Sequence, residues 1–348
     1  MYGERPLECC VVDFSRGQSR SQSTLKGCSF IMLLHRFVTL ALAVAFMTGT
    51  AVAHAAPPAQ GACPPEPVPL SHEVLQKAQQ QATDRGFLWR ISRDGRESFL
   101  YGSMHAGRTD WFALGPQTET ALSSAGVLAL EIDLTDPAVL DALSGAMQGP
   151  ARPLPAALMQ SLRLAWAAEC LPEAALAQGA VELHVMQLAV AQAQRQGLFT
   201  LYSAESLLLM RSMRALRTVV GLESVQTQLS ALMARDDEEA ATMVSEMLAE
   251  LQRPRAASSL ERLAQAWANR DLKDLEAYGE WCDCLNTPTE REMYARLLDG
   301  RNPGLAESIE RLHAEDSVFA AVGALHMVGP QGLPSLLKAR GFTVTRMF

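Results

Sequence analysis

The sequence predicts an α/β fold in which a central mixed sheet is interrupted by long helical insertions. Short apolar segments typical of strands occur near both ends of the chain, within residues 87–132 and 317–346. The long middle, residues 136–313, is rich in Ala, Leu and Gln and contains one short β-type segment at residues 218–221. Strands that alternate with helices around a helical middle favour one α/β domain. No fixed period recurs, so we do not expect a solenoid.

The composition excludes several classes of protein. The chain has 348 residues, 48% of them hydrophobic and 20% charged, with a formal net charge of −8. These values exclude a disordered, collagenous or low-complexity chain. The sequence contains no run of five or more like charges, so nucleic acid is not an expected partner.

Residues 1–55 are typical of a leader with a secretory signal peptide. A positively charged start at residues 32–36 precedes the apolar residues 37–47, and Ala53-His54-Ala55 matches a small-x-small cleavage pattern. The apolar run has about half of the roughly 20 residues that a membrane span needs, so we expect no stable membrane span after cleavage. Residues 1–31 carry charges of both signs, and we expect translation to begin at Met32. The predicted location is periplasmic or secreted.

Four cysteines remain after cleavage: Cys63, Cys170, Cys282 and Cys284. An even number in an oxidising compartment favours two disulfides, and the sequence leaves all three pairings open. Zinc binding by Cys282 and Cys284 is the alternative, although structural zinc motifs normally bring two cysteine pairs at wider spacing.

The mature chain divides into a lead-in, residues 56–85, and a main domain, residues 86–348. The lead-in is Pro-rich and extended up to residue 69, and a helix is expected over residues 71–85. Asp94-Gly95 predicts a hairpin turn. The expected strands are residues 87–91, 99–101, 127–132, 218–221, 317–322 and 342–346, and the expected helices outside the middle are residues 116–124 and 333–340. The acidic residues 236–239 are expected to start a helix or to lie on a solvated helix face.

Two histidines occur in the same local context, in which a predicted strand is followed by Gly-x-x-His. They are His105, after Gly102, and His326, after Gly323. Glycine lets the backbone turn sharply at the carboxyl end of a strand, where open α/β sheets place their ligands. Imidazole there can bind a metal or transfer protons. The alternative is a pair of hydrogen-bonded histidines in sheet-edge loops. The other mature histidines, His72, His184 and His313, lie in helical patterns and are expected to be structural or solvated.

Carboxylates follow two further predicted strands. Glu131 and Asp133 end the strand at residues 127–132, and residues two apart on a strand share a face. Either side chain could ligate a metal, orient a histidine or act as a general base, and the alternative is a helix-capping role. Glu223 follows the segment at residues 218–221.

Arg301 precedes Asn302-Pro303, a pair expected to cap and open a helix. Its guanidinium could also clamp a carboxylate or a developing oxyanion. The His-Glu-x-x-His, Gly-x-Ser-x-Gly and Walker motifs are absent from the sequence. Their absence excludes the commonest metalloprotease, α/β-hydrolase and NTPase classes.

The ordered set of motifs resembles the TraB/PrgY/GumN family, which includes the TIKI proteases, from about Phe87 to the end of the chain. The matching segments are residues 101–105, 130–133, 221–224 with Gln228, 301–303, 322–326 and 329–333. The resemblance implies a TraB/GumN-like domain whose active site contains both Gly-x-x-His histidines and Glu131, supported by Glu223 and Arg301. TIKI relatives are described as metal-dependent proteases, with manganese or cobalt suggested. Ser103 and Ser224 stand where relatives often have Thr, and neither change removes a ligand.

We therefore expect a periplasmic metal-dependent hydrolase that acts on a peptide bond of a peptide or protein substrate. His105, Glu131 and His326 would hold a divalent ion whose bound water is the nucleophile. Glu223 is a candidate base or further ligand, and Arg301 would stabilise negative charge. The alternative is a non-catalytic periplasmic protein that binds a peptide or a haem-like ligand. A third possibility is that the helical middle is an interaction surface and the His/Glu set is inactive.

Overall fold

The computed structural model describes residues 63–348. The predicted signal peptide, its cleavage after Ala55 and the start at Met32 lie outside the described residues. Among the described residues, no helix is long and apolar enough to cross a lipid bilayer.

A six-stranded mixed sheet in the order β4-β3-β5-β2-β1-β6 organises the fold. The strands are β1 (Phe87–Arg93), β2 (Arg96–Ser103), β3 (Val127–Leu130), β4 (Thr218–Gly221), β5 (Val318–Gly323) and β6 (Thr343–Arg346). The first two form the predicted hairpin, with Asp94 and Gly95 at positive φ in the turn. β2, β5, β3 and β4 run parallel to one another, and β1 is antiparallel to both β2 and β6. The predicted mixed α/β sheet is confirmed.

Helices make up the rest of the described chain. They are α2 (His72–Gln80), α3 (Pro116–Ser124), α4 (Pro137–Gln148), α5 (Ala156–Ala168), α6 (Val181–Arg195), α7 (Ala204–Arg214), α8 (Val225–Leu232), α9 (Asp237–Leu251), α10 (Ala256–Asn269), α11 (Leu272–Glu276), α12 (Tyr278–Trp281), α13 (Pro288–Leu297), α14 (Asn302–Glu315) and α15 (Leu333–Ala339). The acidic run starts a helix as predicted, because Asp236 caps α9 by accepting a hydrogen bond from the Glu239 amide.

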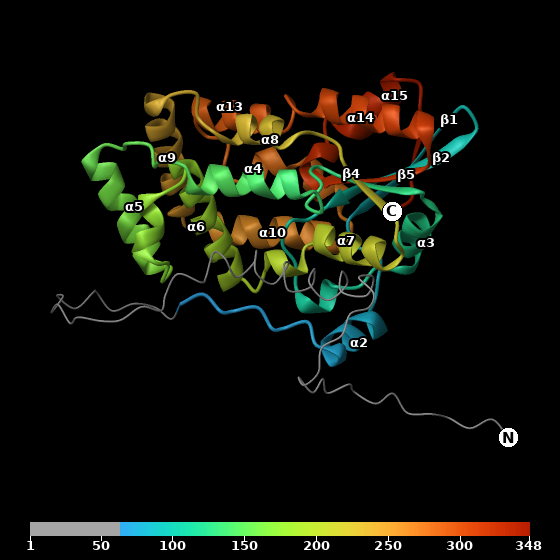
Figure 1. Ribbon diagram of the computed structural model, residues 1–348, viewed down its shortest axis with the longest axis horizontal. Helices are drawn as coiled ribbons and strands as arrows, with labels where there is room; N and C mark the ends of the chain where they lie inside the picture. The colour runs from blue at the N-terminus through green and yellow to red at the C-terminus, as the bar shows by residue number, and fades with distance from the viewer. Residues whose placement is uncertain (1–62) are drawn as a thin grey trace, which may run out of the picture. The chain divides into compact units, whose positions relative to one another are not determined.

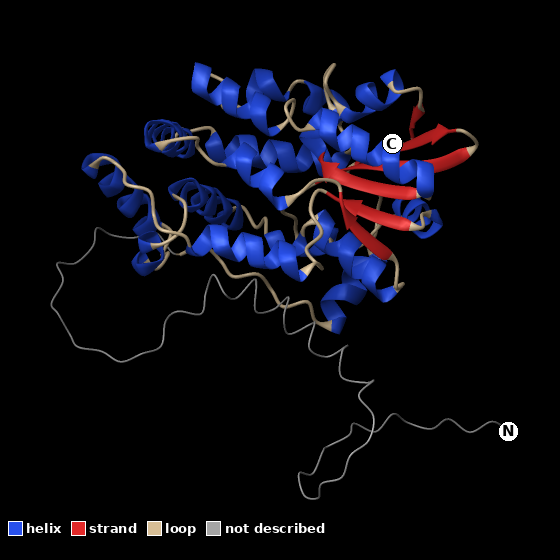
Figure 2. Ribbon diagram, turned by 45° about the horizontal axis from the view of Figure 1, so that its top comes forward, coloured by secondary structure: helices blue, strands red, loops and turns tan. Residues whose placement is uncertain are grey.

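The helices form two groups around the sheet. α14 packs on β5 and on α15, and α7 packs on β3 and β4, so the sheet is covered on both faces (Figure 1). Most of the helical middle, including α4, α5, α6 and α9, lies beyond the end of the sheet at which the parallel strands terminate (Figure 1 and Figure 2). Among them, α5, α6 and α9 share a separate apolar cluster that includes Leu162, Trp166, Val185 and Val244. These three helices therefore share an apolar core of their own.

The first helix and the third strand end clearly earlier than predicted. The first helix ends at Gln80 instead of extending to residue 85. Past its end, Asp84 accepts hydrogen bonds from the amide and hydroxyl of Thr118, so it caps α3, whose N-terminal Gly115 has no side chain to do so. The third strand ends at Leu130 instead of residue 132, which places Glu131 just beyond it.

Both predicted disulfides are present, and the structure selects one of the three pairings. Cys63 is bonded to Cys170, and Cys282 is bonded to Cys284. The zinc alternative for the second pair is wrong, because each sulfur is already bonded to the other.

Candidate functional site

The two Gly-x-x-His motifs lie side by side because β2 and β5 are neighbouring parallel strands. Ser103 at the end of β2 pairs with Gly323 at the end of β5, so the segments that follow the two strands leave the sheet at the same level. His105 follows one strand and His326 follows the other. The sequence repeat is thus a spatial repeat at the carboxyl edge of the sheet.

The two glutamates come to the same edge from β3 and β4. Leu130 is opposite Ala321 of β5 on one side and Gly221 of β4 on the other. The backbone pairing continues past the strands, where the Glu223 amide donates to the Glu131 carbonyl at 3.0 Å. Four strand ends therefore deliver two histidines and two carboxylates to one place.

His105 is held by a carboxylate that the sequence analysis did not identify. Its Nδ1 lies 2.9 Å from Oε1 of Glu205, in the first turn of α7, and the same oxygen accepts a hydrogen bond from the Ser103 hydroxyl. The opposite nitrogen, Nε2, lies 3.8 Å from Oε1 of Glu131. The side chain is 68% exposed, so an incoming molecule can contact the imidazole.

Glu205 also sets the charge of His105. Its negative charge is the largest influence and, with a smaller contribution from Glu131, it outweighs desolvation and raises the pKa of His105 to about 9. His105 is therefore an imidazolium at neutral pH. Burial acts to raise the pKa of Glu205, but the charge and hydrogen bond of His105 prevail and lower it.

His326 has the opposite character. It is 3% exposed, and this burial is the main reason that its pKa is lowered to about 4, against the attraction of Glu131. Its Nδ1 lies 2.6 Å from Oδ1 of Asn302, and the Asn302 amide nitrogen donates to the Gln331 carbonyl at 2.8 Å. That second bond fixes the amide orientation, so His326 carries its proton on Nδ1 and presents a bare Nε2.

Arg301 joins both glutamates. Its Nη2 donates to Glu131 and to Glu223, and its Nε lies 3.1 Å and 3.2 Å from the two oxygens of Glu223. Its Nη1 is 3.4 Å from Nε2 of His326. Only 9% of the Arg301 side chain is exposed, so the cation is enclosed by the groups that it neutralises.

The two carboxylates differ in basicity. Burial acts to raise the pKa of Glu131, but His105, His326, Arg301 and the Gly323 amide together lower it to about 2. The Gly323 amide donates to Oε1 at 2.9 Å, and Gln228 donates to Oε2 at 3.2 Å. Burial raises the pKa of Glu223 despite its bonds to Arg301. Glu223 is thus the better proton acceptor of the two.

The structure brings together all five predicted site residues, and it corrects two other predictions. Asp133 does not reach the site, because the strand ends early and its Oδ1 accepts hydrogen bonds from the amide and hydroxyl of Thr135. Asn302 is not the helix cap: Arg301 occupies that position, and the Asn302 side chain orients His326. Because the Asn-Pro pair already predicted a helix start, nothing in the sequence indicated that the Asn302 side chain contacts His326.

The donor types at this edge suit a divalent ion, but their arrangement does not. Each imidazole has Nδ1 engaged by an oxygen acceptor, as metal-bound histidines do, but Nε2 of His326 already contacts Arg301. Within residues 63–348, however, no three His, Cys, Asp or Glu side chains are grouped to hold a metal. The guanidinium of Arg301 takes up both glutamates and faces Nε2 of His326. An ion bound there would have to displace Arg301, so we derive no chemical step through a metal.

Comparison with known proteins agrees with the order of motifs along the chain. Neither a curated protein nor a solved structure matches the sequence significantly. The model of the TraB/PrgY/gumN family matches residues 87–346, from the first strand to the last and hence most of the chain. The protein therefore belongs to the TraB/PrgY/gumN family.

Proposed function

We propose that this protein is an exported hydrolase that cleaves peptide bonds at the carboxyl edge of its sheet. The observation that carries the proposal is the pairing of an accessible imidazolium with a carboxylate across a gap: Nε2 of His105 is 3.8 Å from Oε1 of Glu131. At this separation the two groups attract each other as an ion pair without a direct hydrogen bond, so the Nε2 proton is left for an incoming molecule.

Amide hydrolysis needs three contributions that these residues can supply. A water molecule must lose a proton as its oxygen bonds to the carbonyl carbon, and Glu223 is the carboxylate whose pKa is raised. The carbonyl oxygen gains negative charge, which Arg301 can stabilise if its guanidinium shifts a donor away from Glu131 or Glu223. When the C–N bond breaks, the leaving nitrogen needs a proton, and the His105 imidazolium can donate it from Nε2.

Dependence on a metal is a separate part of the proposal and comes from the family resemblance. The resemblance implies manganese or cobalt held by His105, Glu131 and His326, and such an ion would require Arg301 to move away from Glu131 and His326. When bound, such an ion would supply a water of lowered pKa. The periplasmic or secreted location is likewise proposed from the leader sequence, and fractionation of cells that express the full chain tests it.

The central experiment incubates the purified mature chain with a peptide library, with and without chelator and with added manganese or cobalt. We expect cleavage that is lost in His105→Ala and Glu131→Gln and retained in His72→Ala, a matched change at an exposed histidine on α2. Loss of cleavage on chelation would support a metal held by His105, Glu131 and His326. Cleavage that persists would favour a metal-free site in which Arg301 binds both glutamates. A folded protein that cleaves nothing under any condition overturns the hydrolase proposal and favours the ligand-binding alternative.

A further inference from the structure

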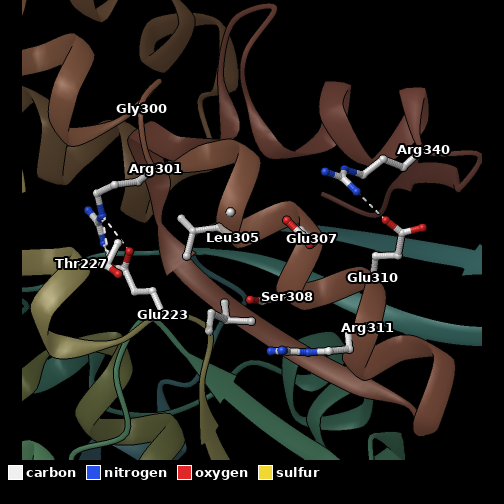
Figure 3. A pocket seen from close by; sticks show the side chains of 12 residues that line it. Glu223, Thr227, Gly300, Arg301, Leu305, Glu307, Ser308, Glu310, Arg311 and Arg340 are labelled. Carbon is white, nitrogen blue, oxygen red and sulfur yellow. Dashed lines mark hydrogen bonds and ion pairs between the residues drawn. The ribbon is translucent and has the colours of Figure 1, made fainter.

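A groove of about 630 Å³ begins at the site and follows the exposed side of α14. Arg301 and Glu223 lie at one end of it, and Arg311 and Arg340 lie at the other (Figure 3). Two residues of the site therefore also line a cavity large enough for part of a ligand chain.

The dimensions of the groove suit an extended peptide. Gly304, Ser308 and Arg311 recur at spacings of three and four, so they line one side of the helix. From Arg301 to Arg311 the helix rises about 15 Å, which is the length of about four to five residues of extended chain. Leu222 adds an apolar contact, and a Cβ built on Gly304 meets no atom within 4 Å, so this part of the groove is open.

The far end of the groove has one cation, Arg311, that is not paired with a carboxylate of residues 63–348. Glu310 is shared by two arginines, because it accepts hydrogen bonds from Arg93 at 2.6 Å and also from Arg340. The Arg311 side chain, in contrast, has no hydrogen bond or ion pair with another described residue. Arg93 also lies 3.5 Å from Asp94, so Glu310 and Asp94 balance Arg93 and Arg340, and Arg311 is the cation left over among the described residues at this end. At the near end the charge of Arg301 is already neutralised by Glu131 and Glu223.

One opposing charge lies between the two ends. Glu307 lines the groove one turn before Arg311, and within residues 63–348 it has no ion pair. It is exposed, so a ligand can pass it at low electrostatic cost. Removing its charge should strengthen the attraction of the groove for an anion.

We propose that this groove binds the part of a peptide substrate that leads away from the scissile bond, and that it selects a segment with carboxylates four to five residues from that bond. The inference rests on the proposed function for the position of the bond. The binding of an acidic segment is a separate property and is measured separately.

The test measures fluorescence anisotropy of labelled peptides of equal length that are rich in Glu, Gln or Lys, with the purified mature chain. We expect the Glu peptide to bind most tightly. Gly304→Trp fills the groove and should weaken that binding about tenfold or more. Gly145→Trp is the matched control, because Gly145 is an equally open helical position on α4 that does not line the groove. Circular dichroism confirms that both variants are folded.

Two charge variants test the selectivity. Arg311→Ala should weaken binding of the Glu peptide about two- to fivefold, as expected for one exposed ion pair, and Arg311→Lys should retain it. Glu307→Gln should tighten binding by a similar factor. Equal affinities for the three peptides, or undiminished binding by folded Gly304→Trp, overturn the proposal.

The same variants separate this inference from the proposed function. If Gly304→Trp leaves cleavage unchanged, the hydrolase proposal stands and the proposed role of the groove is overturned. If the Glu peptide binds in the groove but no peptide is cleaved under any condition, the proposed role of the groove stands and the hydrolase proposal is overturned.

Discussion

The charge of His105 depends on one neighbour, Glu205. Replacement by Gln keeps the shape of the side chain and removes the largest influence that raises the pKa of His105. We expect an imidazole pKa of about 9 in the wild type and a value closer to the ordinary 6.5 in Glu205→Gln, measured by NMR titration. If His105 is the proton donor, the alkaline limit of hydrolysis should move to lower pH with it. A wild-type pKa near 6.5 would contradict the assignment.

The same pair makes stability depend on pH in a definite direction. The pKa of His105 in the folded protein is raised above its unfolded value of 6.5, so the folded state binds the proton more tightly. The stabilisation is therefore complete below pH 6.5 and is lost as the pH rises through about 9. Thermal denaturation should show wild type and Glu205→Gln differing at pH 6 and converging above pH 9. A constant difference across this range would show that the Glu205 contribution is steric.

Gly323 gives the sharpest steric prediction. A Cβ at this position would lie 3.1 Å from Nε2 of His105 and 3.5 Å from Oε1 of Glu131. The exposed imidazole can move outward, so Gly323→Ala should fold normally but widen the gap between the two groups. We expect hydrolysis to fall about 100-fold, the scale expected for a misplaced reacting group. Gly145→Ala is the control, and comparable loss of activity in both variants would refute the placement of the gap.

At the scale of elements, α10 supports the strand that leads to His105. The indole nitrogen of Trp267 donates to the Gly102 carbonyl at 2.9 Å, and the Trp267 carbonyl accepts from the Gly86 amide at 2.9 Å. Trp267→Phe keeps most of the packing but leaves the buried Gly102 carbonyl without this donor. We expect a loss of about 1–3 kcal/mol in the free energy of unfolding, measured with urea.

A matched substitution separates this effect from the loss of an indole in general. Trp281 of α12 donates to the Asp274 carbonyl at 2.9 Å in a partly buried setting away from the sheet. Trp281→Phe should therefore lower stability less than Trp267→Phe and leave hydrolysis unchanged. Equal effects of the two changes on both measurements would show that Trp267 has no special relation to the site.

The elements were predictable where local chemistry determines them. Asp94-Gly95 fixed the hairpin, and the apolar runs identified the strands of the sheet. The predicted boundaries were wrong where a residue distant in the sequence determines the end of an element. Asp84, which was predicted to belong to the first helix, instead caps α3. The site divides in the same way. Residues that follow strands were identifiable, because the ends of parallel strands meet.

Glu205 was not identifiable from the sequence. It lies in the first turn of a helix, where an acidic residue is ordinary, and its contact with His105 spans about a hundred positions of the chain. Nothing local distinguishes it from the other first-turn glutamates. Its role follows from the packing of α7 against β3 and β4, which only the assembled fold provides.

For the molecule as a whole, α5, α6 and α9 share an apolar cluster that is separate from the one around the sheet, so what joins the two clusters matters for stability. One link is the lead-in segment: the Tyr202 hydroxyl donates to the Val68 carbonyl, and Cys63 is bonded to Cys170 just after α5. This disulfide connects residues 107 positions apart. Cys282 and Cys284 are only two positions apart and restrict the unfolded chain much less.

The two disulfides should therefore contribute unequally to stability. Loss of a cross-link that closes a loop of this length removes about 3–5 kcal/mol, because the unfolded chain gains conformational freedom. We expect the double variant Cys63→Ala/Cys170→Ala to unfold at a clearly lower urea concentration than the wild type. Cys282→Ala/Cys284→Ala is the control and should shift the midpoint much less. If the control pair shifted it as far, the stabilising effect would come from local packing around the sulfurs instead of from the link between the lead-in and the helical insertion.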